Sequence, residues 1–206
     1  EGRALQEAVV ARVRHYGMRM VGPNCLGVVN ADPEINLNAT FATAFPPHGN
    51  VAFSSKSGAL GLAILEHARE LALGISTFVS VGNKADVSGQ DLIAYWETDP
   101  ATEVILLYLE NLGDTRRFME LARRVSRKKP IAVVKSGRTE AGARAASSHT
   151  GSLAGMDVAV DAILGQAGVI RTDTIDELFD VAMLLANQPV PKGPRVAILT
   201  NAGGPG

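Results

Sequence analysis

The stretch of sequence that decides the fold is residues 51–65, which read VAFSSKSGALGLAIL. Its first four residues, Val51–Ser54, form a short run suited to a β-strand. Small and polar side chains then interrupt the run at Ser55-Lys56-Ser57-Gly58. From Leu60 onward, apolar residues recur at the spacing of one helix face. The stretch therefore predicts a strand that leads through a polar turn into a helix.

The same unit recurs along the chain. Apolar runs suited to strands alternate with segments of helical spacing, and the runs are nearly continuous, which is typical of a parallel sheet covered on both faces. Right-handed crossovers then give a doubly wound, flavodoxin-like α/β fold. The other predicted strands are residues 75–81, 104–109, 131–134 and 196–200, and the other predicted helices are residues 4–16, 89–96, 115–127, 153–166 and 176–187.

Composition excludes several classes of protein. The 206 residues include 20 Lys and Arg against 21 Asp and Glu, so no excess of cations exists to neutralise a nucleic-acid backbone. Hydrophobic residues make up 46%, which argues against disorder. The longest apolar runs, Val104–Leu109 and Val181–Ala186, are far shorter than the ~18 residues of a membrane span. A single cysteine forms no internal disulfide and fits the cytoplasm.

Glycines concentrate just after the predicted strands. In an open parallel sheet, ligands bind outside the carboxyl ends of the strands, where helix N-termini present their N–H groups. Glycine at these places lets the backbone approach an anion, although a tight turn alone also explains each glycine. The residues concerned are Gly58, Gly82, Gly113, Gly137, Gly203 and Gly204.

Two of these turns combine glycine with further donors. Ser55-Lys56-Ser57-Gly58 places two hydroxyls and a cation at a helix start, which suits phosphate or carboxylate. An ordinary serine N-cap explains the same residues. Thr200-Asn201-Ala202-Gly203-Gly204 repeats the pattern but lacks the Gly-Lys-Ser/Thr of a P-loop.

Two titratable residues are candidates for chemistry. His149 lies in a polar loop, residues 147–152, where a neutral imidazole can act as a nucleophile or proton carrier. A solvated loop histidine remains the alternative. Glu110 follows the run 104–109, so it is expected at the carboxyl edge of the sheet, where it could orient an imidazole. A solvated acid at a strand end explains Glu110 equally well.

Together, these motifs resemble the NDP-forming acyl-CoA synthetases. That superfamily includes the α subunit of succinyl-CoA synthetase and the ADP-forming acetyl-CoA synthetases. The sequence of residues 148–155, SHTGSLAG, is most similar to that of the ADP-forming acetyl-CoA synthetase branch. The resemblance covers essentially the whole chain, and its motifs occur in the family's order: residues 22–25, residues 55–60, residues 82–86, Glu110 and residues 148–151.

The resemblance implies a role for each matching residue. His149 corresponds to the histidine that attacks an acyl-phosphate and then carries the phosphoryl group to ADP on a mobile loop, and Glu110 to the glutamate that holds it. Ser55, Lys56, Ser57 and Gly58 correspond to the start of a helix that stabilises the phosphohistidine. Ala202, Gly203 and Gly204 resemble the start of the partner helix. Asn24 and Cys25 correspond to a segment near the thiol and acyl group of CoA.

The same resemblance implies cofactors and partners. The reaction would use CoA, ADP or ATP, phosphate and a small carboxylic acid, with Mg²⁺ accompanying the nucleotide on a domain outside this chain. The partners would be an ATP-grasp domain or β subunit and a CoA-binding domain, and homo-oligomer formation stays open. No nucleic acid, membrane or metal ligand within the chain is expected.

The resemblance also divides the chain. Residues 1–30 would be the end of a CoA-binding, Rossmann-like domain and residues 31–48 a connection rich in proline. Residues 49–190 would be a flavodoxin-like phosphohistidine domain, and residues 191–206 the start of another α/β domain. Such a chain is not expected to complete the reaction by itself.

Two other functions stay open from the sequence. Ligase-like modules also regulate protein lysine acetyltransferases, but such modules often lack the histidine, so His149 favours a ligase. The third hypothesis is a flavodoxin-like binding module without catalytic activity. A flavin site would need aromatic residues to sandwich the ring, and the loops concerned offer few.

Overall fold

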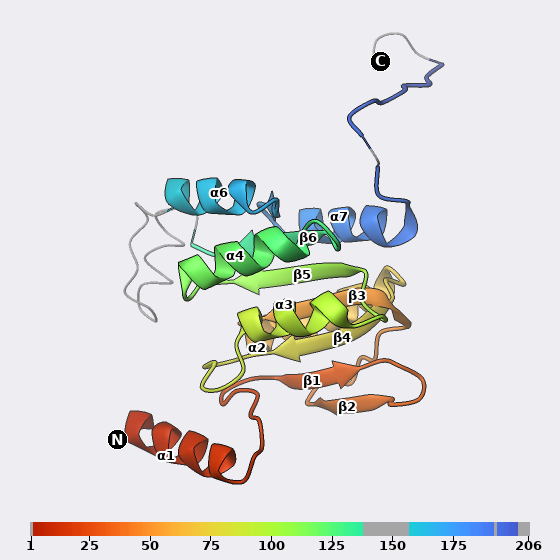
Figure 1. The fold of residues 1–206 in the computed structure, drawn as a ribbon. Helices are drawn as coiled ribbons and strands as arrows, with labels where there is room; N and C mark the ends of the chain where they lie inside the picture. Colours follow the sequence, from red (N-terminus) through yellow and green to blue (C-terminus); the bar gives the residue numbers. More distant parts are fainter. Residues whose placement is uncertain (1, 138–156, 192, 202–206) are drawn as a thin grey trace.

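The protein is a seven-stranded sheet with helices on both faces, described by a computed structural model over residues 2–137, 157–191 and 193–201 (Figure 1). The strands are β1 (Gly27–Asn30), β2 (Leu37–Thr40), β3 (His48–Ser55), β4 (Ile75–Ser80), β5 (Val104–Leu109), β6 (Ile131–Lys135) and β7 (Ile170–Thr172). The helices are α1 (Gly2–His15), α2 (Gly58–Glu70), α3 (Gly89–Thr98), α4 (Thr115–Val125), α6 (Asp157–Gln166) and α7 (Ile175–Asn187).

The strand order confirms the predicted flavodoxin-like fold. The sheet runs β2-β1-β4-β3-β5-β6-β7, and the five strands from β4 to β7 are parallel. Numbered among themselves, these five strands have the order 2-1-3-4-5, which is the flavodoxin-like arrangement. The sequence-based expectation of a doubly wound parallel sheet is therefore correct for this part of the chain.

The apolar strands are buried because each face of the sheet has its own layer of helices. Along β5, Ile105 and Leu107 pack in the core beneath α3, α4 and α6. Leu106, which points the other way, packs in the core formed with α2 and α7. Successive side chains of a strand alternate between faces, so a strand covered on both faces needs apolar residues at every position.

Polar residues cap the N-termini of four helices. Ser57, Ser88, Asp114 and Thr174 are the N-caps of α2, α3, α4 and α7, and each side chain accepts a hydrogen bond from a first-turn N–H. Such caps typically contribute about 1 kcal/mol each. They fix where the helices start, and hence which backbone groups face the carboxyl edge of the sheet.

The structure differs from the sequence-based prediction at the N-terminal edge of the sheet. β1 and β2 form an antiparallel hairpin, and β1 also pairs antiparallel with β4. Residues 31–48, which the sequence predicts to be a connection, thus contain the strand β2, and β1 lies in the same sheet as β3. The unpaired edge of β4 explains this, because its N–H and C=O groups need a partner strand.

The predicted strand at residues 196–200 is also absent from the described part of the chain. The segment extends away from the sheet (Figure 1), and Val196 and Ile198 are 85% and 74% exposed. A strand exists only through hydrogen bonds to a neighbouring strand, and none of the described residues provides one here. Similarly, only residues from Asp157 onward of the helix predicted over residues 153–166 are described.

Candidate functional site

An open pocket of about 840 Å³ lies at the carboxyl edge of the sheet. It forms where β3 and β5 end, beside the start of α2. This is the topological switch point, because the chain leaves β3 through α2 on one face and later reaches β5 through α3 on the other. Six residues proposed from the sequence line it: Asn24, Cys25, Lys56, Ser57, Gly58 and Glu110.

The two serines of the turn before α2 have different roles. Ser57 is the N-cap, since its Oγ accepts from the backbone N–H of Leu60 at 3.3 Å. Ser55 is fully buried, and its Oγ donates to the carbonyl of Ser57 at 2.8 Å. Ser55 therefore shapes the turn from below, whereas Lys56, Ser57 and Gly58 face the pocket.

Lys56 and Glu110 bring the ends of two neighbouring strands together. Lys56 Nζ lies 3.7 Å from Glu110 Oε2, and both side chains are mostly buried, at 21% and 25% exposed. The backbone supports this approach, because the N–H of Lys56 donates to the carbonyl of Tyr108 at 3.1 Å. Glu110 is therefore a carboxylate held at the carboxyl edge beside a helix start, as the sequence predicts.

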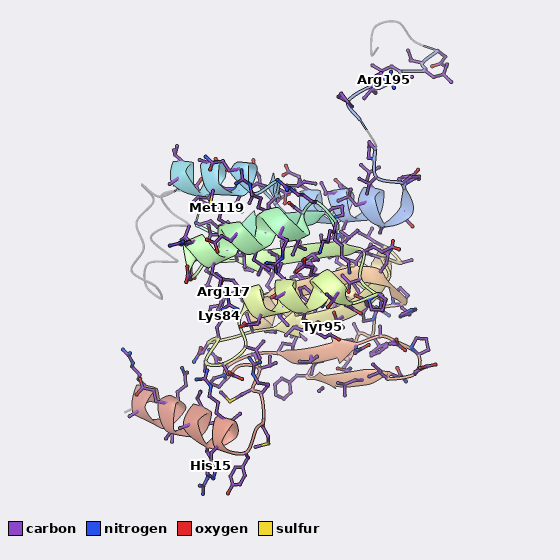
Figure 2. The ribbon with its side chains drawn as sticks, viewed as in Figure 1. His15, Lys84, Tyr95, Arg117, Met119 and Arg195 are labelled. Atoms are coloured by element: carbon purple, nitrogen blue, oxygen red, sulfur yellow. The ribbon has the colours of Figure 1, made fainter. Side chains whose placement is uncertain are left out.

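A second lysine, Lys84, carries a charge close to this pair. Burial lowers the pKa of Lys84, repulsion by Lys56 lowers it further, and Glu110 opposes both effects. Lys84 lies at the same edge of the sheet as Arg117 (Figure 2). Sequence reasoning quoted the loop of residues 82–86 but gave Lys84 no role; its position after an apolar strand was the available signal. Lys84 lines a neighbouring pocket and not the switch-point pocket, so it acts on Lys56 and Glu110 only through its electrostatic interaction with them.

The segment with Asn24 and Cys25 reaches the pocket because it lies directly on the loop of residues 82–86. The N–H of Asn83 donates to the carbonyl of Pro23 at 2.8 Å, and that of Ala85 to Gly22 at 3.0 Å. Gly82 has a φ of +50°, and a Cβ there would lie 2.3 Å from the carbonyl oxygen of Pro23. A side chain at position 82 would therefore force the two backbones apart.

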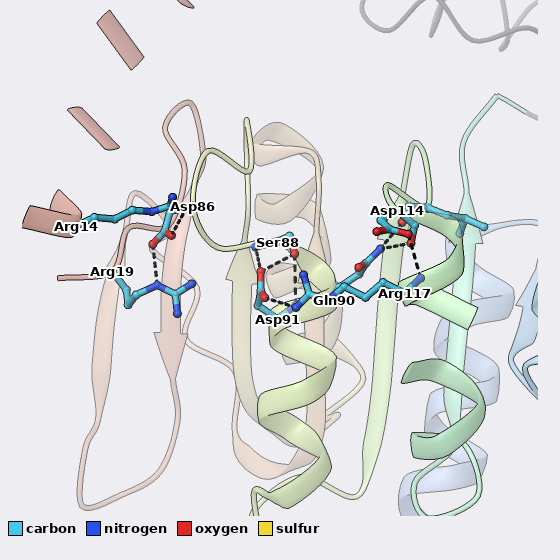
Figure 3. A network of polar contacts seen from close by, with 9 residues as sticks. Arg14, Arg19, Asp86, Ser88, Gln90, Asp91, Asp114 and Arg117 are labelled. Carbon is cyan, nitrogen blue, oxygen red and sulfur yellow. Dashed lines mark hydrogen bonds and ion pairs between the residues drawn. The ribbon is translucent and has the colours of Figure 1, made fainter. Parts of the chain in front are cut away.

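Asp86 fastens the same segment from its other end. Its carboxylate accepts from Arg19 Nε at 2.9 Å, from the N–H of Met20 at 2.9 Å and from Arg14 at 3.2 Å (Figure 3). Hydrogen bonds from Arg19, then from Met20 and Arg14, lower the pKa of Asp86 to about 2. The Asp86 side chain is only 3% exposed, so this group joins the chain after α1 to the main sheet.

The structure also adds apolar residues to the pocket that sequence reasoning did not single out. Phe41, Leu26 and Leu62 line it together with Ala59 and the polar Asn83. Phe41 directly follows β2, in the segment that the sequence predicts to be a connection. His149, Ala202, Gly203 and Gly204, which the sequence proposes for catalysis and phosphate binding, lie outside the described residues.

Two further observations concern the described ranges alone. Within residues 2–137, 157–191 and 193–201, no group of three or more His, Cys, Asp and Glu side chains could hold a metal ion. Over the same ranges, no helix has the length and apolar character needed to cross a bilayer.

The fold and the pocket define a class: flavodoxin-like α/β domains with an open ligand site at the topological switch point. Comparison with known proteins gives the family. Residues 48–185 match the family described as succinyl-CoA ligase like flavodoxin domain. The chain belongs to this family, which agrees with the resemblance of its motifs.

Similar proteins cover the whole of this chain. The α subunit of ADP-forming acetate–CoA ligase I from Pyrococcus furiosus is 48% identical over 206 residues, which are 100% of this chain and 44% of that protein. ADP-forming 4-hydroxybutyrate–CoA ligase from Nitrosopumilus maritimus is 44% identical and is covered to 30%.

A similar solved structure is dinucleotide forming acetyl-coenzyme A synthetase 1 from Candidatus Korarchaeum cryptofilum in complex with phosphate and ADP. It is 46% identical with a TM-score of 0.89, and the match covers 98% of this chain and 43% of that one. The chain thus spans less than half the length of each of these three relatives.

Proposed function

We propose that this chain is the central part of an ADP-forming acyl-CoA ligase, which interconverts acyl-CoA, ADP and phosphate with a carboxylate, CoA and ATP through a phosphohistidine at His149. The observation that carries the proposal is the meeting of Lys56, Glu110 and the start of α2 in one open pocket with the segment of Asn24 and Cys25. The names of the relatives, each matched over less than half its length, support the same activity.

The proposed reaction has three steps. A phosphate oxygen attacks the thioester carbonyl, the C–S bond breaks and CoA leaves as thiolate, so that an acyl-phosphate forms. A ring nitrogen of neutral His149 then attacks the phosphorus, and the P–O bond to the acyl oxygen breaks to release the carboxylate. Finally, a terminal phosphate oxygen of ADP attacks the phosphohistidine, which yields ATP and regenerates His149.

The charges around the pocket suit these anions. Gly58 and Ala59 line the pocket and lie in the first turn of α2, where N–H groups have no partner within the helix. The helix dipole adds about half an elementary positive charge at this end. Lys56 contributes an ammonium group 3.7 Å from the carboxylate of Glu110, and Lys84 interacts electrostatically with both. The carboxylate can in turn accept an N–H from the imidazole of His149.

Other parts of the complete protein would supply what the chain lacks. An ATP-grasp domain or β subunit would bind ADP or ATP, with Mg²⁺ bound to the nucleotide and assisting phosphoryl transfer there. A CoA-binding domain would hold the cofactor so that its thioester reaches Asn24 and Cys25. The remaining substrate would be a small carboxylic acid, and the site of action the cytoplasm.

The test is phosphoryl labelling of the complete protein together with its grasp domain. With Mg²⁺ and [γ-³²P]ATP, the wild type should acquire a phosphate that is labile in acid and stable in alkali, as expected of a phosphorus–nitrogen bond. His149→Asn should not be labelled. The matched control is His48→Asn, because His48 is exposed and starts β3 at the opposite edge of the sheet.

Each result decides the proposal. Labelling of the wild type and His48→Asn alone, followed by transfer of the label to ADP, supports the phosphohistidine route. Equal labelling of the wild type and His149→Asn would place the phosphate elsewhere and end the proposal, as would a wild type that makes acyl-CoA from acid, CoA and ATP without any acid-labile phosphate.

A further inference from the structure

Gln90 is a buried polar side chain beside the loop that carries Glu110. It lies in the first turn of α3 and is 7% exposed. Its side-chain Nε2 donates to the carbonyls of Leu112 and Asp114, both at 2.8 Å (Figure 3). Because only the NH₂ group of a glutamine amide can donate, these two carbonyls fix the orientation of the side chain. Gln90 therefore uses both of its side-chain N–H groups on one loop, residues 110–114.

The backbone of this loop has few other hydrogen bonds. The loop joins β5 to α4, and Gly113 within it has a φ of +70°. Among the residues that the structure describes, no other hydrogen bond reaches the backbone of residues 111–113. The side chain of Leu112 packs in the core at 8% exposed, so its carbonyl is left without a donor if Gln90 is lost. The course of the loop therefore depends on Gln90.

Glu110 and Gln90 lie on opposite sides of this loop. Glu110 lines the switch-point pocket. Gln90 lines a separate hollow of about 180 Å³ at the starts of α3 and α4, together with Leu112 and Asp114. The carbonyl that Gln90 holds belongs to the second residue after Glu110. A shift of that carbonyl moves the backbone from which the Glu110 side chain leaves.

The direction of the Glu110 carboxylate depends on this backbone. Lys56 Nζ is 3.7 Å from Glu110 Oε2, which is too far for a hydrogen bond. In the described part of the chain, no side chain or N–H group donates a hydrogen bond to that carboxylate. A catalytic group must be held within about 0.5 Å of its productive place, and a 1 Å displacement can cost about 100-fold in rate. The loop is what remains to hold Glu110 in place.

We propose that Gln90 is a positioning residue for phosphohistidine formation. Its two hydrogen bonds hold residues 110–114 so that the Glu110 carboxylate meets the imidazole of His149. The inference rests on the proposed ligase function and adds a residue of α3 to it. Because Gln90 lies outside the switch-point pocket, it acts on the reaction only through Glu110.

A double-mutant cycle tests this dependence in the complete protein with its grasp domain. The rate of His149 labelling from Mg²⁺ and [γ-³²P]ATP is measured by rapid quench in the wild type, Gln90→Met, Glu110→Gln and the double variant. Methionine has nearly the size of glutamine but donates no hydrogen bond. Gln90→Asn keeps an amide that is one methylene too short, and it provides a second cycle if the methionine variant does not fold.

We expect Gln90→Met to lower the labelling rate by about 10-fold when Glu110 is present, as is typical when the partner of a functional group is removed. In the Glu110→Gln background the same substitution should lower the rate by less than about 2-fold, because no carboxylate is left to position. A loss of folding stability alone would lower the labelling by the same factor in both backgrounds.

Arg117→Met is the matched control. Arg117 Nη2 donates to Asp91 Oδ1 at 2.7 Å, so this pair also joins α4 to α3 (Figure 3). The Arg117 side chain is 54% exposed, and the pair does not reach residues 110–113. The variant should be labelled at the wild-type rate, whatever its effect on the melting temperature.

Two results would overturn the inference while the ligase function stands. Gln90→Met and Gln90→Asn could be labelled at the wild-type rate, or they could lower the rate by the same factor with and without Glu110. Labelling of Glu110→Gln at the wild-type rate would also end it, since Gln90 would then have nothing to position. Failure of the proposed function is a separate result, seen in the wild type as the absence of phosphohistidine, and the inference would fall with it.

Discussion

Lys56 and Glu110, which follow β3 and β5, meet with Nζ and Oε2 3.7 Å apart at the carboxyl edge of the sheet. They are 54 positions apart in the chain and become neighbours because β3 and β5 pair in parallel, with Ser55 opposite Tyr108. At 3.7 Å the two groups are too far apart for a hydrogen bond, so we expect the pair to contribute only modestly to folding although both side chains are mostly buried. Its place at the switch point, beside a helix start, is what makes it a functional candidate.

Glu110→Gln should therefore impair the chemistry more than the fold. The amide keeps the shape but no longer provides a carboxylate to orient an imidazole, so we expect the rate of histidine labelling to fall by about 10- to 100-fold. The free energy of unfolding should fall by about 1 kcal/mol, because the substitution leaves the mostly buried Lys56 without its carboxylate partner but breaks no hydrogen bond. Rapid-quench labelling and urea denaturation measure the two quantities.

The control for this substitution is Glu120→Gln, which breaks an exposed pair with Arg116 within α4. It should leave both quantities as in the wild type. A Glu110→Gln enzyme that is labelled at the wild-type rate would remove Glu110 from the mechanism.

Asp86→Asn should detach the segment that carries Asn24 and Cys25. The amide cannot replace a carboxylate that accepts from Arg14, Arg19 and the N–H of Met20. Because hydrogen bonds to a buried charge are lost, we expect about 2 kcal/mol of destabilisation. Hydrogen exchange should also become faster at residues 18–25 than in the sheet. Urea denaturation and exchange by mass spectrometry test this.

The comparison is Asp32→Asn, since Asp32 accepts a local N–H from Glu34 that an amide oxygen can also accept. Its exchange pattern should match the wild type. Unchanged exchange at residues 18–25 in Asp86→Asn would mean that other contacts hold the segment.

Gly82→Ala should be strongly destabilising. Alanine at a φ of +50° costs about 1–2 kcal/mol, and its Cβ would lie 2.3 and 2.4 Å from the carbonyl oxygens of Pro23 and Asn24. We expect the free energy of unfolding to fall by more than about 2 kcal/mol, measured by urea denaturation.

Gly165→Ala in α6 is the opposite case, because nothing lies within 4 Å of its Cβ position and no positive φ is present. It should stabilise the protein by about 0.5 kcal/mol, and equal effects of both substitutions would contradict the geometry.

Glu97 should account for part of the loss of folding stability at low pH. Hydrogen bonds from Arg124 and then from Lys128 lower the pKa of Glu97 to about 2, from 4.5. A carboxyl whose pKa is lower in the folded than in the unfolded state stabilises the fold at pH values above its unfolded pKa, and this contribution is lost as the pH falls through the folded pKa. The stability difference between the wild type and Glu97→Gln should therefore be constant above about pH 5 and shrink towards pH 2.

Urea denaturation at several pH values measures this difference. Glu7→Gln serves as the control, because Glu7 and its partner Arg3 are 65% and 91% exposed, so this pair should contribute little at any pH. A difference for Glu97→Gln that does not depend on pH would show that the ion pair does not stabilise the folded state.

The sequence by itself determined the fold class and which residues stand at the helix start that borders the site. Runs such as Val104–Leu109 are typical of a strand covered by helices on both faces, because nearly all of their side chains are apolar and buried there. Local turn chemistry likewise placed Lys56, Ser57 and Gly58 at a helix start, since an N-cap and the helix it begins are neighbours in the chain.

Only the tertiary structure decided what lies next to that helix start. The pairing of β1 with β4, the electrostatic interaction of Lys84 with Lys56 and the position of Phe41 in the pocket beside Lys56 all join residues distant in sequence. No local periodicity encodes these contacts, because they depend on which strand edge is left unpaired and on which loops meet at the carboxyl edge. The physical reason is the same for all three: propensity acts on neighbours along the chain, whereas a binding site is formed by neighbours in space.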